Sequence, residues 1–374
     1  MSFRFMTLAR WQRLTSSGIA LLGLPFRRLA GWLRRHPGVG DWFLADARSP
    51  EERYRRFNEW CFARFDEQER MLADRVRMDF YQAAIARRVQ PGDRVIDLGT
   101  GTGILAAMAA RRGAARVYAI DHSDILRHAR SLATANEVRQ VEFIATHSRE
   151  FHLEERVDVI VQEQMGDFLF DESMIANVTD LRDRLLKPGG AIVPGCFDFF
   201  CEPVTISDER RVPFIWELDV KGYSYAVLAG SRPLDPSYYR QSFSGGDAIA
   251  HFLGEPEPLC TFDLHTVSAD DIPCDLTSTR VVHEGGRLDG FVVYFRARVD
   301  DDLVLTTDPK APNRATHWGL RVLRVEQGEA RTGATIHFNL RVGDWSDPDT
   351  WRWEHRVAPA AVEAIDAPSG GQKG

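Results

Sequence analysis

The spacing of apolar residues changes rhythm twice along this chain of 374 residues. From about residue 50 to 89, apolar side chains recur at helical intervals and charged residues occupy the other faces. Between 94 and 186, short apolar segments typical of strands alternate with helical segments. This alternation predicts a mostly parallel sheet with helices on both faces. After Pro194 short strands predominate, which favours a β sandwich or barrel as a second domain.

The pattern also predicts where each element begins and ends. Strands of the first sheet are expected at 94–98, 115–120, 141–145 and 157–161. Helices are expected at 104–112 and 125–136, and a further helix is expected to close at 181–186. Strands of the second domain are expected at 197–204, 261–267, 277–282, 290–299, 318–324 and 335–342, with an excursion at 221–246. We expect four regions: an N-terminal arm at 1–50, a helical cap with the first sheet at 51–194, the barrel domain at 195–357, and a disordered tail at 358–374.

The net charge of −7 conceals an asymmetry between the arm and the rest of the chain. Residues 1–40 carry seven arginines and no acid, which leaves −14 on the remainder. A body this acidic argues against nucleic acid as the main partner and suits a cationic substrate. The apolar run in the arm is too short to span a bilayer and lacks a convincing cleavage site. The arm is interpreted as a partner-docking or poorly ordered extension, with a membrane-surface or organellar role as the alternative.

Cysteine and lysine usage narrow the cellular setting. Five cysteines without a Cys-x-x-Cys pair indicate neither a disulfide framework nor a zinc site, so no metal is expected. Such thiols suit the cytoplasm, which is the expected location. The chain has four lysines and is otherwise basic through arginine, which hints at a GC-rich bacterial coding sequence.

Two acids flank a Gly-containing, aromatic-rich turn just after the strand at 157–161. Glu163 follows the strand directly, and Glu172 lies on the far side of the turn. Two carboxylates held in this way can close on a planar cation, and the donor fork of a guanidinium matches them bidentately. From these residues alone, an ordinary solvated acidic loop is an equal alternative.

A glycine-rich turn follows the first strand. A dinucleotide fold would need Gly-x-Gly-x-x-Gly and a P-loop would need Gly-Lys-Ser/Thr, and neither pattern is present. The spacing Asp97-x-Gly99-x-Gly101-x-Gly103 instead resembles motif I of the class I S-adenosylmethionine methyltransferases. S-adenosyl-L-methionine is therefore the expected cofactor, with a bare tight turn as the competing explanation.

Two further acids are candidates for the same cofactor. Asp121 ends the second strand, where a carboxylate can accept from both ribose hydroxyls, although a solvated strand-end acid is a fair alternative. Glu150 lies just past the third strand, where an acceptor for the adenine amino group is expected.

Several separated motifs between residues 60 and 355 resemble the protein arginine methyltransferases, with a divergent bacterial member as the hypothesis. Segment 69–77 is similar to the family's cofactor-covering helix, 163–174 to its double-glutamate loop, 185–194 to its crossing into the barrel, and 316–318 to its acceptor-pocket loop. The resemblance implies a Rossmann-like class I methyltransferase domain followed by a β-barrel domain. It also implies arginine N-methyltransferase activity and a head-to-tail homodimer whose arm is the excursion.

The resemblance assigns roles to individual residues. It implies that Arg77 holds the methionine carboxylate and that Met71 borders the transferred methyl group. Asp74 and His317 would pair across the two domains as a proton exit. The implied substrate pocket contains Gln164, Met165, Asp167, Met174 and Trp318. Core packing is the alternative for Met71 and Met174, and a hydrogen-bonded loop histidine is the alternative for His317.

Two positions in the double-glutamate loop depart from the family pattern. Relatives usually carry Trp and Tyr where this chain has Gln164 and Asp167. These changes would make the acceptor entrance more polar and acidic. Asp167 could meet the α-ammonium of free arginine or a second basic residue of a peptide.

The favoured hypothesis is therefore methylation of arginine in a protein or peptide. Methylation of free L-arginine or another small guanidine is the nearest alternative, and a non-catalytic cofactor-binding scaffold for arginine-rich partners is a third. An oxidoreductase is the least compatible with the glycine spacing.

Overall fold

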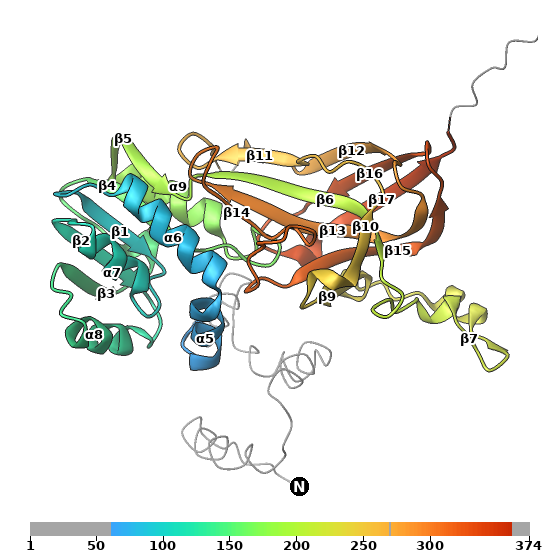
Figure 1. The fold of residues 1–374 in the computed structure, drawn as a ribbon, viewed down its shortest axis with the longest axis horizontal. Helices are drawn as coiled ribbons and strands as arrows, with labels where there is room; N and C mark the ends of the chain where they lie inside the picture. Colours follow the sequence, from blue (N-terminus) through green and yellow to red (C-terminus); the bar gives the residue numbers. More distant parts are fainter. Residues whose placement is uncertain (1–60, 269–270, 361–374) are drawn as a thin grey trace, which may run out of the picture. The chain divides into compact units, whose positions relative to one another are not determined.

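The computed structural model of the protein describes residues 61–268 and 271–360. The chain divides after Cys61 into two compact units, and the second, which begins at Phe62, holds both predicted sheets (Figure 1). The predicted arm at 1–50, residues 51–60 of the predicted helical cap and residues 361–374 of the tail predicted from 358 lie outside the described residues.

The first sheet is entirely parallel and has the strand order β3-β2-β1-β4-β5. Its strands are β1 (Arg94–Leu98), β2 (Arg116–Asp121), β3 (Val141–Ala145), β4 (Val157–Gln162) and β5 (Leu186–Val193). The direction of strand order reverses beside β1, and sheets of this kind bind ligands outside the carboxyl ends of the strands at that point. Both predicted chemical motifs follow such ends, after β1 and after β4.

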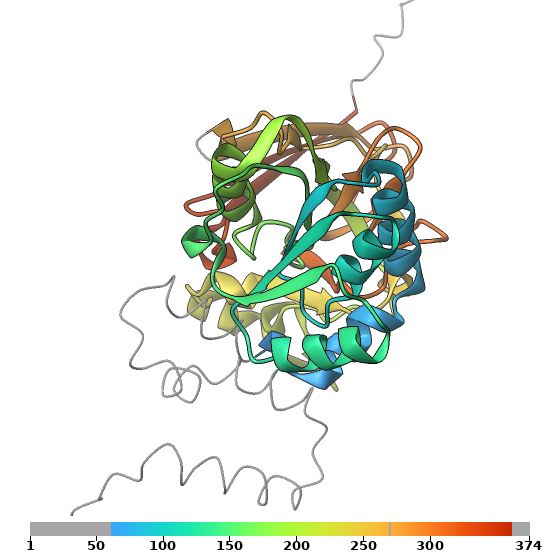
Figure 2. The same cartoon turned by 90° about the vertical axis from the view of Figure 1, so that its left-hand side faces the viewer.

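Helices cover both faces of the parallel sheet, as Figure 2 shows. On one face α6 (Arg75–Arg88) packs against α7 (Ile104–Arg111), and α8 (Leu126–Ala135) packs against β3. On the other face α9 (Met174–Leu185) lies against β4 and β5. The predicted α/β class of this region is confirmed.

Two element boundaries differ from the predicted ones. The helical segment predicted from 50 to 89 is broken at Asp74, which separates α5 (Phe65–Ala73) from α6. Asp74 caps α6, because its backbone is extended and its Oδ1 accepts from the Arg77 N–H at 3.0 Å. The helix predicted to close at 181–186 is α9, which begins at Met174 and ends at Leu185, because Leu186 already belongs to β5, whose residues pair in parallel with β4.

The second sheet system is antiparallel, and the predicted β-barrel class is confirmed. The larger sheet has the order β10-β6-β13-β15-β9, and the smaller has the order β12-β16-β17. Their strands are β6 (Cys196–Ile206), β9 (Arg240–Phe243), β10 (Ile249–Phe252), β11 (Cys260–Asp263), β12 (Asp275–Val281), β13 (Gly286–Arg298), β14 (Val304–Thr306), β15 (Leu320–Ala330), β16 (Thr335–Arg341) and β17 (Arg352–Ala358). Phe291 of β13 stacks on Phe338 of β16 with ring centroids 4.1 Å apart, which joins the two sheets.

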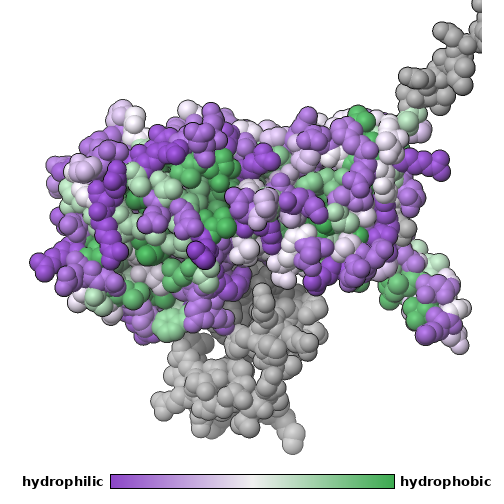
Figure 3. Space-filling model, viewed as in Figure 1, coloured by the Kyte–Doolittle hydropathy of each residue, from purple (hydrophilic) through white to green (hydrophobic). Residues whose placement is uncertain are grey.

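The predicted excursion is displaced along the chain. The segment that leaves the sheet covers 207–239 and contains the small hairpin of β7 (Asp219–Val220) and β8 (Tyr223–Ser224). From here on, the arm means this segment and not the N-terminal residues 1–50. Residues 240–243, predicted to belong to the excursion, form β9 because they pair with β15. The arm projects beside β9 in Figure 1 and carries apolar residues on its surface in Figure 3.

A buried ion pair connects the two barrel sheets. Glu202 of β6 accepts two hydrogen bonds from Arg280 of β12, at 2.7 and 2.8 Å, and Glu202 is fully buried. A bidentate geometry of this kind is the arrangement that best offsets the desolvation of two buried charges.

Replacing Glu202 with Leu should leave the Arg280 guanidinium buried without its carboxylate. We expect a loss of about 3–5 kcal/mol in the free energy of unfolding, measured by urea titration. Glu142→Leu, which breaks the exposed pair between Glu142 and Arg116, is the matched control and should leave the midpoint unchanged. Equal effects of the two variants would contradict this account.

Candidate active site

The turn after β1 is built for close approach to its backbone. Gly99, Gly101 and Gly103 all adopt left-handed conformations, with φ values of +71°, +54° and +83°. A Cβ at Gly103 would lie 2.9 Å from the Phe143 ring, and one at Gly101 would lie 3.0 Å from the Gln68 amide oxygen. Side chains are therefore excluded here both by backbone conformation and by space.

Asp97 and Asp121 hold this turn in place. Asp97 Oδ2 accepts from Thr100 Oγ1 at 2.5 Å and from the Ala106 N–H at 2.9 Å. Asp121 Oδ2 accepts from the Gly101 N–H at 2.9 Å, so the acid predicted to bind ribose also fixes the glycine turn. Asp121 Oδ1 accepts from the backbone and hydroxyl of Ser123.

One atom of this region fits a bound ligand. Asp97 Oδ1 is buried and has no hydrogen-bond partner among the described residues, and burial raises the pKa of Asp97 to about 6. An orphaned buried carboxylate oxygen beside a glycine turn suits a cationic donor such as the α-ammonium of S-adenosylmethionine. Glu150, the predicted adenine acceptor, is exposed in a short 3-10 turn at Ser148–Glu150.

Arg77 lies between the two predicted sites. Its Nη2 pairs with Glu163 Oε2 at 3.1 Å, and its Nη1 donates to the Met71 carbonyl at 3.1 Å. Its guanidinium carbon also lies 5.5 Å from the centre of the Tyr81 ring. The predicted partner of Arg77 was the cofactor carboxylate, whereas in this structure the guanidinium pairs with Glu163. Arg77 Nε is buried and without a partner among the described residues, so a donor remains for an anionic ligand.

Glu163 and Glu172 are partly buried carboxylates with raised pKa values. Burial raises the pKa of Glu172 well above its ordinary value, and the negative charge of Glu163 raises it further. Burial also raises the pKa of Glu163, although Arg77 opposes the rise. Both carboxylates lie in a surplus of negative charge, and a cation bound between them would relieve it. The solvated-loop alternative is therefore wrong. We refer to these two residues as the clamp.

The loop that joins the two clamp residues is anchored in the barrel. Phe170 packs on Trp345 with centroids 4.2 Å apart, and Phe168 packs edge-on against Trp351 at 5.2 Å. Asp171 folds the loop on itself, because its Oδ1 accepts from the Phe168 N–H at 3.0 Å. A Cβ at Gly166 would lie 2.0 Å from the same oxygen, which explains the glycine between the two acids.

Asp74 and His317 meet across the two sheets, but not through the imidazole. Asp74 Oδ2 accepts from the backbone N–H groups of Thr316 and His317, at 2.5 and 2.7 Å. The predicted carboxylate–imidazole pair is therefore absent from the described residues. Burial, followed by the charges of Arg77 and Arg70, lowers the pKa of His317 to about 4. With this pKa the imidazole carries no charge at neutral pH, so it can accept a proton there.

Asp167 and Gln164 already have partners within the chain. Asp167 Oδ1 accepts from the Gly319 N–H at 2.8 Å, and its Oδ2 pairs with the Arg321 guanidinium. The prediction that Asp167 adds an unpaired acid to the acceptor entrance is therefore wrong. Gln164 accepts from Asn177 of α9 at 3.3 Å and lies 3.9 Å from where a Cβ at Gly99 would be, so it faces the glycine turn and not an entrance.

The remaining predicted pocket residues are buried supports. Met165, Met174 and Trp318 are at most 2% exposed, and Met71 is 6% exposed. Trp318 Nε1 donates to the Met165 carbonyl, which ties the barrel loop to the loop between the clamp residues. These contacts favour core packing, the alternative considered for Met71 and Met174.

Sequence reasoning missed several residues that complete this arrangement. Tyr81 is fully buried and donates to the Gln162 carbonyl at 2.9 Å, directly before Glu163. Arg321 pairs with Asp167, and Asn177 donates to Gln164; Asp167 and Gln164 are the two positions that depart from the family pattern. The acid Glu67, at the start of α5, contributes negative charge to both clamp residues. Tyr81 had a signal, since it lies four residues after Arg77 on the same helical face.

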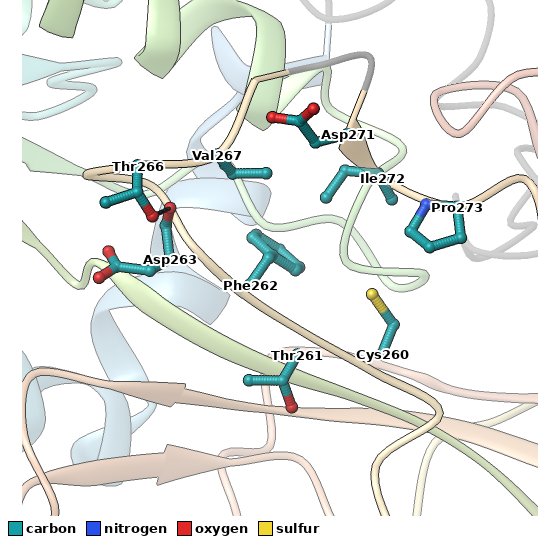
Figure 4. A pocket seen from close by; sticks show the side chains of 9 residues that line it. All are labelled: Cys260, Thr261, Phe262, Asp263, Thr266, Val267, Asp271, Ile272 and Pro273. Atoms are coloured by element: carbon teal, nitrogen blue, oxygen red, sulfur yellow. Dashed lines mark hydrogen bonds between the residues drawn. The ribbon is translucent and has the colours of Figure 1, made fainter.

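A separate pocket of about 320 Å³ lies in the barrel between β11 and residues 266–267 and 271–273 (Figure 4). It contains none of the predicted site residues. Within 61–268 and 271–360, no group of three or more His, Cys, Asp or Glu side chains has the geometry to hold a metal ion. Among these residues no helix is long and apolar enough to cross a membrane.

Comparisons with known proteins agree with this geometry. Residues 82–195 match the family model of ribosomal protein L11 methyltransferase (PrmA). The chain is 34% identical over 300 residues to protein arginine N-methyltransferase PRMT10 of Arabidopsis thaliana, a match that covers 70% of this chain and 77% of the relative. The chain belongs to the protein arginine N-methyltransferase family. The family prediction is thereby confirmed.

Solved structures of family members share the fold. A structure described as a uniquely open conformation of Arabidopsis thaliana protein arginine methyltransferase 10 gives a TM-score of 0.65 at 26% identity and covers 80% of this chain and 99% of that one. The PRMT1 enzyme–prozyme heterotetrameric complex with AdoHcy from Trypanosoma brucei gives 0.68 at 24% identity, over 79% and 94% of the two chains. These relatives are eukaryotic, and they lend no support to the bacterial origin suggested by the arginine bias.

The raised pKa of Glu172 predicts a conflict between stability and activity. A carboxyl whose pKa is higher in the folded state loses stability when it ionises, so the cost is absent well below its ordinary pKa of 4.5 and grows as the pH rises. Glu172→Gln should therefore raise the thermal midpoint of the ligand-free protein at pH 8 and not at pH 4, while methyl transfer is lost. A lower midpoint at pH 8 would contradict the assignment of Glu172 as a destabilising, partly buried acid.

Proposed function

We propose that this chain transfers methyl groups from S-adenosylmethionine to a guanidino nitrogen of arginine in a protein or peptide. The observation that carries the proposal is the clamp, because Glu163 and Glu172 are two partly buried acids with raised pKa values, and Arg77 is paired with Glu163 alone. A guanidinium supplies two parallel N–H donors and a positive charge, which satisfies both carboxylates at once. Family membership agrees with this assignment.

The clamp also addresses the weak nucleophilicity of the substrate. A guanidinium has a pKa above 12 and its lone pairs are delocalised, so it attacks poorly in water. Two carboxylates draw positive charge toward the nitrogens that they bind, which leaves the remaining terminal nitrogen freer to attack. When bound, S-adenosylmethionine supplies an electrophilic methyl group on its sulfonium. The chain contributes orientation, exclusion of water and a route for the proton that the attacking nitrogen releases, for which His317 is the candidate.

The cofactor would be held by residues that the structure places around the glycine turn. Gly99, Gly101 and Gly103 leave space along the backbone, Asp97 offers an unpaired oxygen, and Arg77 offers an unpaired Nε–H. Asp121 and Glu150 remain the candidates for the ribose and adenine groups.

Asp167 does not separate a peptide from free arginine as the acceptor. The sequence offered this acid as a partner for the α-ammonium of free arginine or for a second basic residue of a peptide, but its oxygens bind Gly319 and Arg321. The preference for a peptide or protein rests on the relatives, which are named protein arginine N-methyltransferases.

Product analysis should separate these acceptors. With S-adenosylmethionine, an Arg-Gly-rich peptide should gain 14 Da steps in a mass spectrum, whereas free L-arginine under the same conditions should not. Glu163→Gln should reduce peptide turnover by roughly 10²- to 10³-fold, because it removes a preorganised charge from the clamp. Turnover of free arginine without turnover of the peptide would reverse the assignment. Cofactor binding without methylation of either acceptor would favour a scaffold.

We further propose that the protein is a homodimer assembled through the arm. Three apolar side chains of the arm are largely in solvent: Tyr223 is 74%, Val227 84% and Leu234 98% exposed. The base of the arm is rigid, because the Arg324 guanidinium of β15 stacks 3.9 Å from the Phe214 ring, which itself stacks on Trp216. A firmly held segment with exposed apolar tips is typical of a surface covered by a partner.

The double change Val227→Glu and Leu234→Glu should convert a dimer into a monomer. Its mass by light scattering after gel filtration should be half that of the unchanged protein, because the charges would have to be buried in the interface. Val281→Glu, which alters a half-exposed valine of β12, is the matched control and should remain dimeric. An unchanged dimer in the double variant would place the interface elsewhere.

A cytoplasmic location is also proposed. Its support is that Cys196, Cys201, Cys260 and Cys274 carry free thiols. Free thiols persist most readily in a reducing compartment.

A further inference from the structure

The hydrogen bonds of Asp74 leave it unable to serve the His317 side chain. Oδ1 accepts from the Arg77 N–H as the cap of α6, and Oδ2 accepts from the N–H groups of Thr316 and His317. Three backbone donors thus converge on this carboxylate, which is 3% exposed. Asp74 therefore positions the loop that carries the histidine, and a different group must orient the imidazole.

The His317 ring has one acid within ion-pairing distance among the described residues. Its Nδ1 is buried without a hydrogen-bond partner there, and it lies 4.0 Å from Glu67 Oε1. Glu67 belongs to the first turn of α5, and its side chain is 16% exposed. At 4.0 Å these two atoms are too far apart for a hydrogen bond, and catalytic contacts of this kind often tighten when ligands bind.

Arg70 holds the two groups together. Its Nη1 donates to Glu67 Oε2 at 2.8 Å, and its Nη2 donates to the His317 carbonyl at 3.2 Å. One guanidinium therefore connects the acid on α5 with the loop that carries the histidine. Because Arg70 uses Oε2, Glu67 Oε1 remains directed to the imidazole side of the contact.

We infer that Glu67 is the positioning residue for His317, and that it accepts the Nδ1–H so that Nε2 keeps the lone pair that receives the substrate proton. This inference rests on the proposed function. In the step, the S–CH₃ bond breaks and an N–CH₃ bond forms, and the attacking nitrogen loses one proton. His317 takes that proton at Nε2, and the negative charge of Glu67 stabilises the resulting imidazolium.

The charges around His317 explain why such a partner is needed. Arg70 of α5 and Arg77 of α6 both disfavour the imidazolium, whereas Asp74 and Asp167 favour it. Burial and the two arginines prevail, and the pKa of His317 falls to about 4. Asp167 is paired with Arg321, and Asp74 is saturated by backbone donors. Glu67 is the acid with an oxygen left for the ring.

The tautomer of His317 tests the contact without any turnover. In protein labelled with ¹⁵N-histidine, the ring nitrogen shifts at pH 7.5 should show His317 as the Nδ1–H tautomer, with its signals assigned by their loss in His317→Gln. Glu67→Ala should shift the ring to the Nε2–H tautomer, while Asp66→Asn, an exposed acid one residue earlier, should leave it unchanged. An Nε2–H tautomer in the unchanged protein would overturn the inference, whatever its activity.

Kinetics then separate positioning from a merely structural role. Glu67→Gln keeps an acceptor but removes the charge, so kcat for the peptide should fall about tenfold or more, with the acidic limb of its pH profile moved to lower pH. The kcat of Glu67→Ala should be lower still, and that of Glu67→Asp should lie between those of Glu67→Gln and the unchanged protein. The kcat of Asp66→Asn should equal that of the unchanged protein. Identical pH profiles for Glu67→Gln and the unchanged protein would refute the role of Glu67. Absence of peptide methylation by the unchanged protein would refute the proposed function and leave the tautomer result to decide the contact.

Discussion

The rest of this structure accommodates one unfavourable arrangement, two like-charged carboxylates that are partly buried in one loop. Burial raises the pKa values of both Glu163 and Glu172, and the negative charge of Glu163 raises that of Glu172 further. Without contacts to the barrel, a loop with two such carboxylates would turn them toward solvent. The loop between them is instead held by Phe168 and Phe170, whose rings are packed among the tryptophans of the barrel. Apolar burial in one domain thus maintains an electrostatic strain at the edge of the other.

The two sheets are joined at the site by acids that accept backbone N–H groups. Asp74 binds the barrel loop at 316–317, and Asp167 binds the same loop at Gly319. Hydrogen bonds from a carboxylate to buried N–H groups are among the stronger ones in proteins. The Trp318 indole closes the same contact by donating to Met165. Four successive positions of one barrel loop, 316–319, therefore fix the relative position of α6, the clamp and the barrel.

Features set by short-range spacing could be predicted from the sequence, and features set by long-range pairing could not. The Asp97–Gly103 turn, the parallel sheet and the two clamp acids depend on residues a few positions apart or on strand periodicity. The fate of Asp167 depends on Arg321, which lies 154 residues later. A sequence shows that an acid is near an entrance, but not whether a cation from another strand has already neutralised it. The same limit applies to Asp74, whose backbone donors carry no sequence signature.

The clamp also links acceptor binding to proton release. Because burial and the charge of Glu163 raise the pKa of Glu172 well above its ordinary value, this carboxyl gives up its proton at a higher pH than an exposed glutamate does. A guanidinium can occupy the clamp fully when that proton has left, so binding of the acceptor strengthens as the pH rises. This proton is distinct from the one that the attacking nitrogen releases during methyl transfer, and it departs before that step. Glu67 and Asp171 raise the pKa of Glu172 further, so residues outside the clamp set the pH range in which it binds its cation.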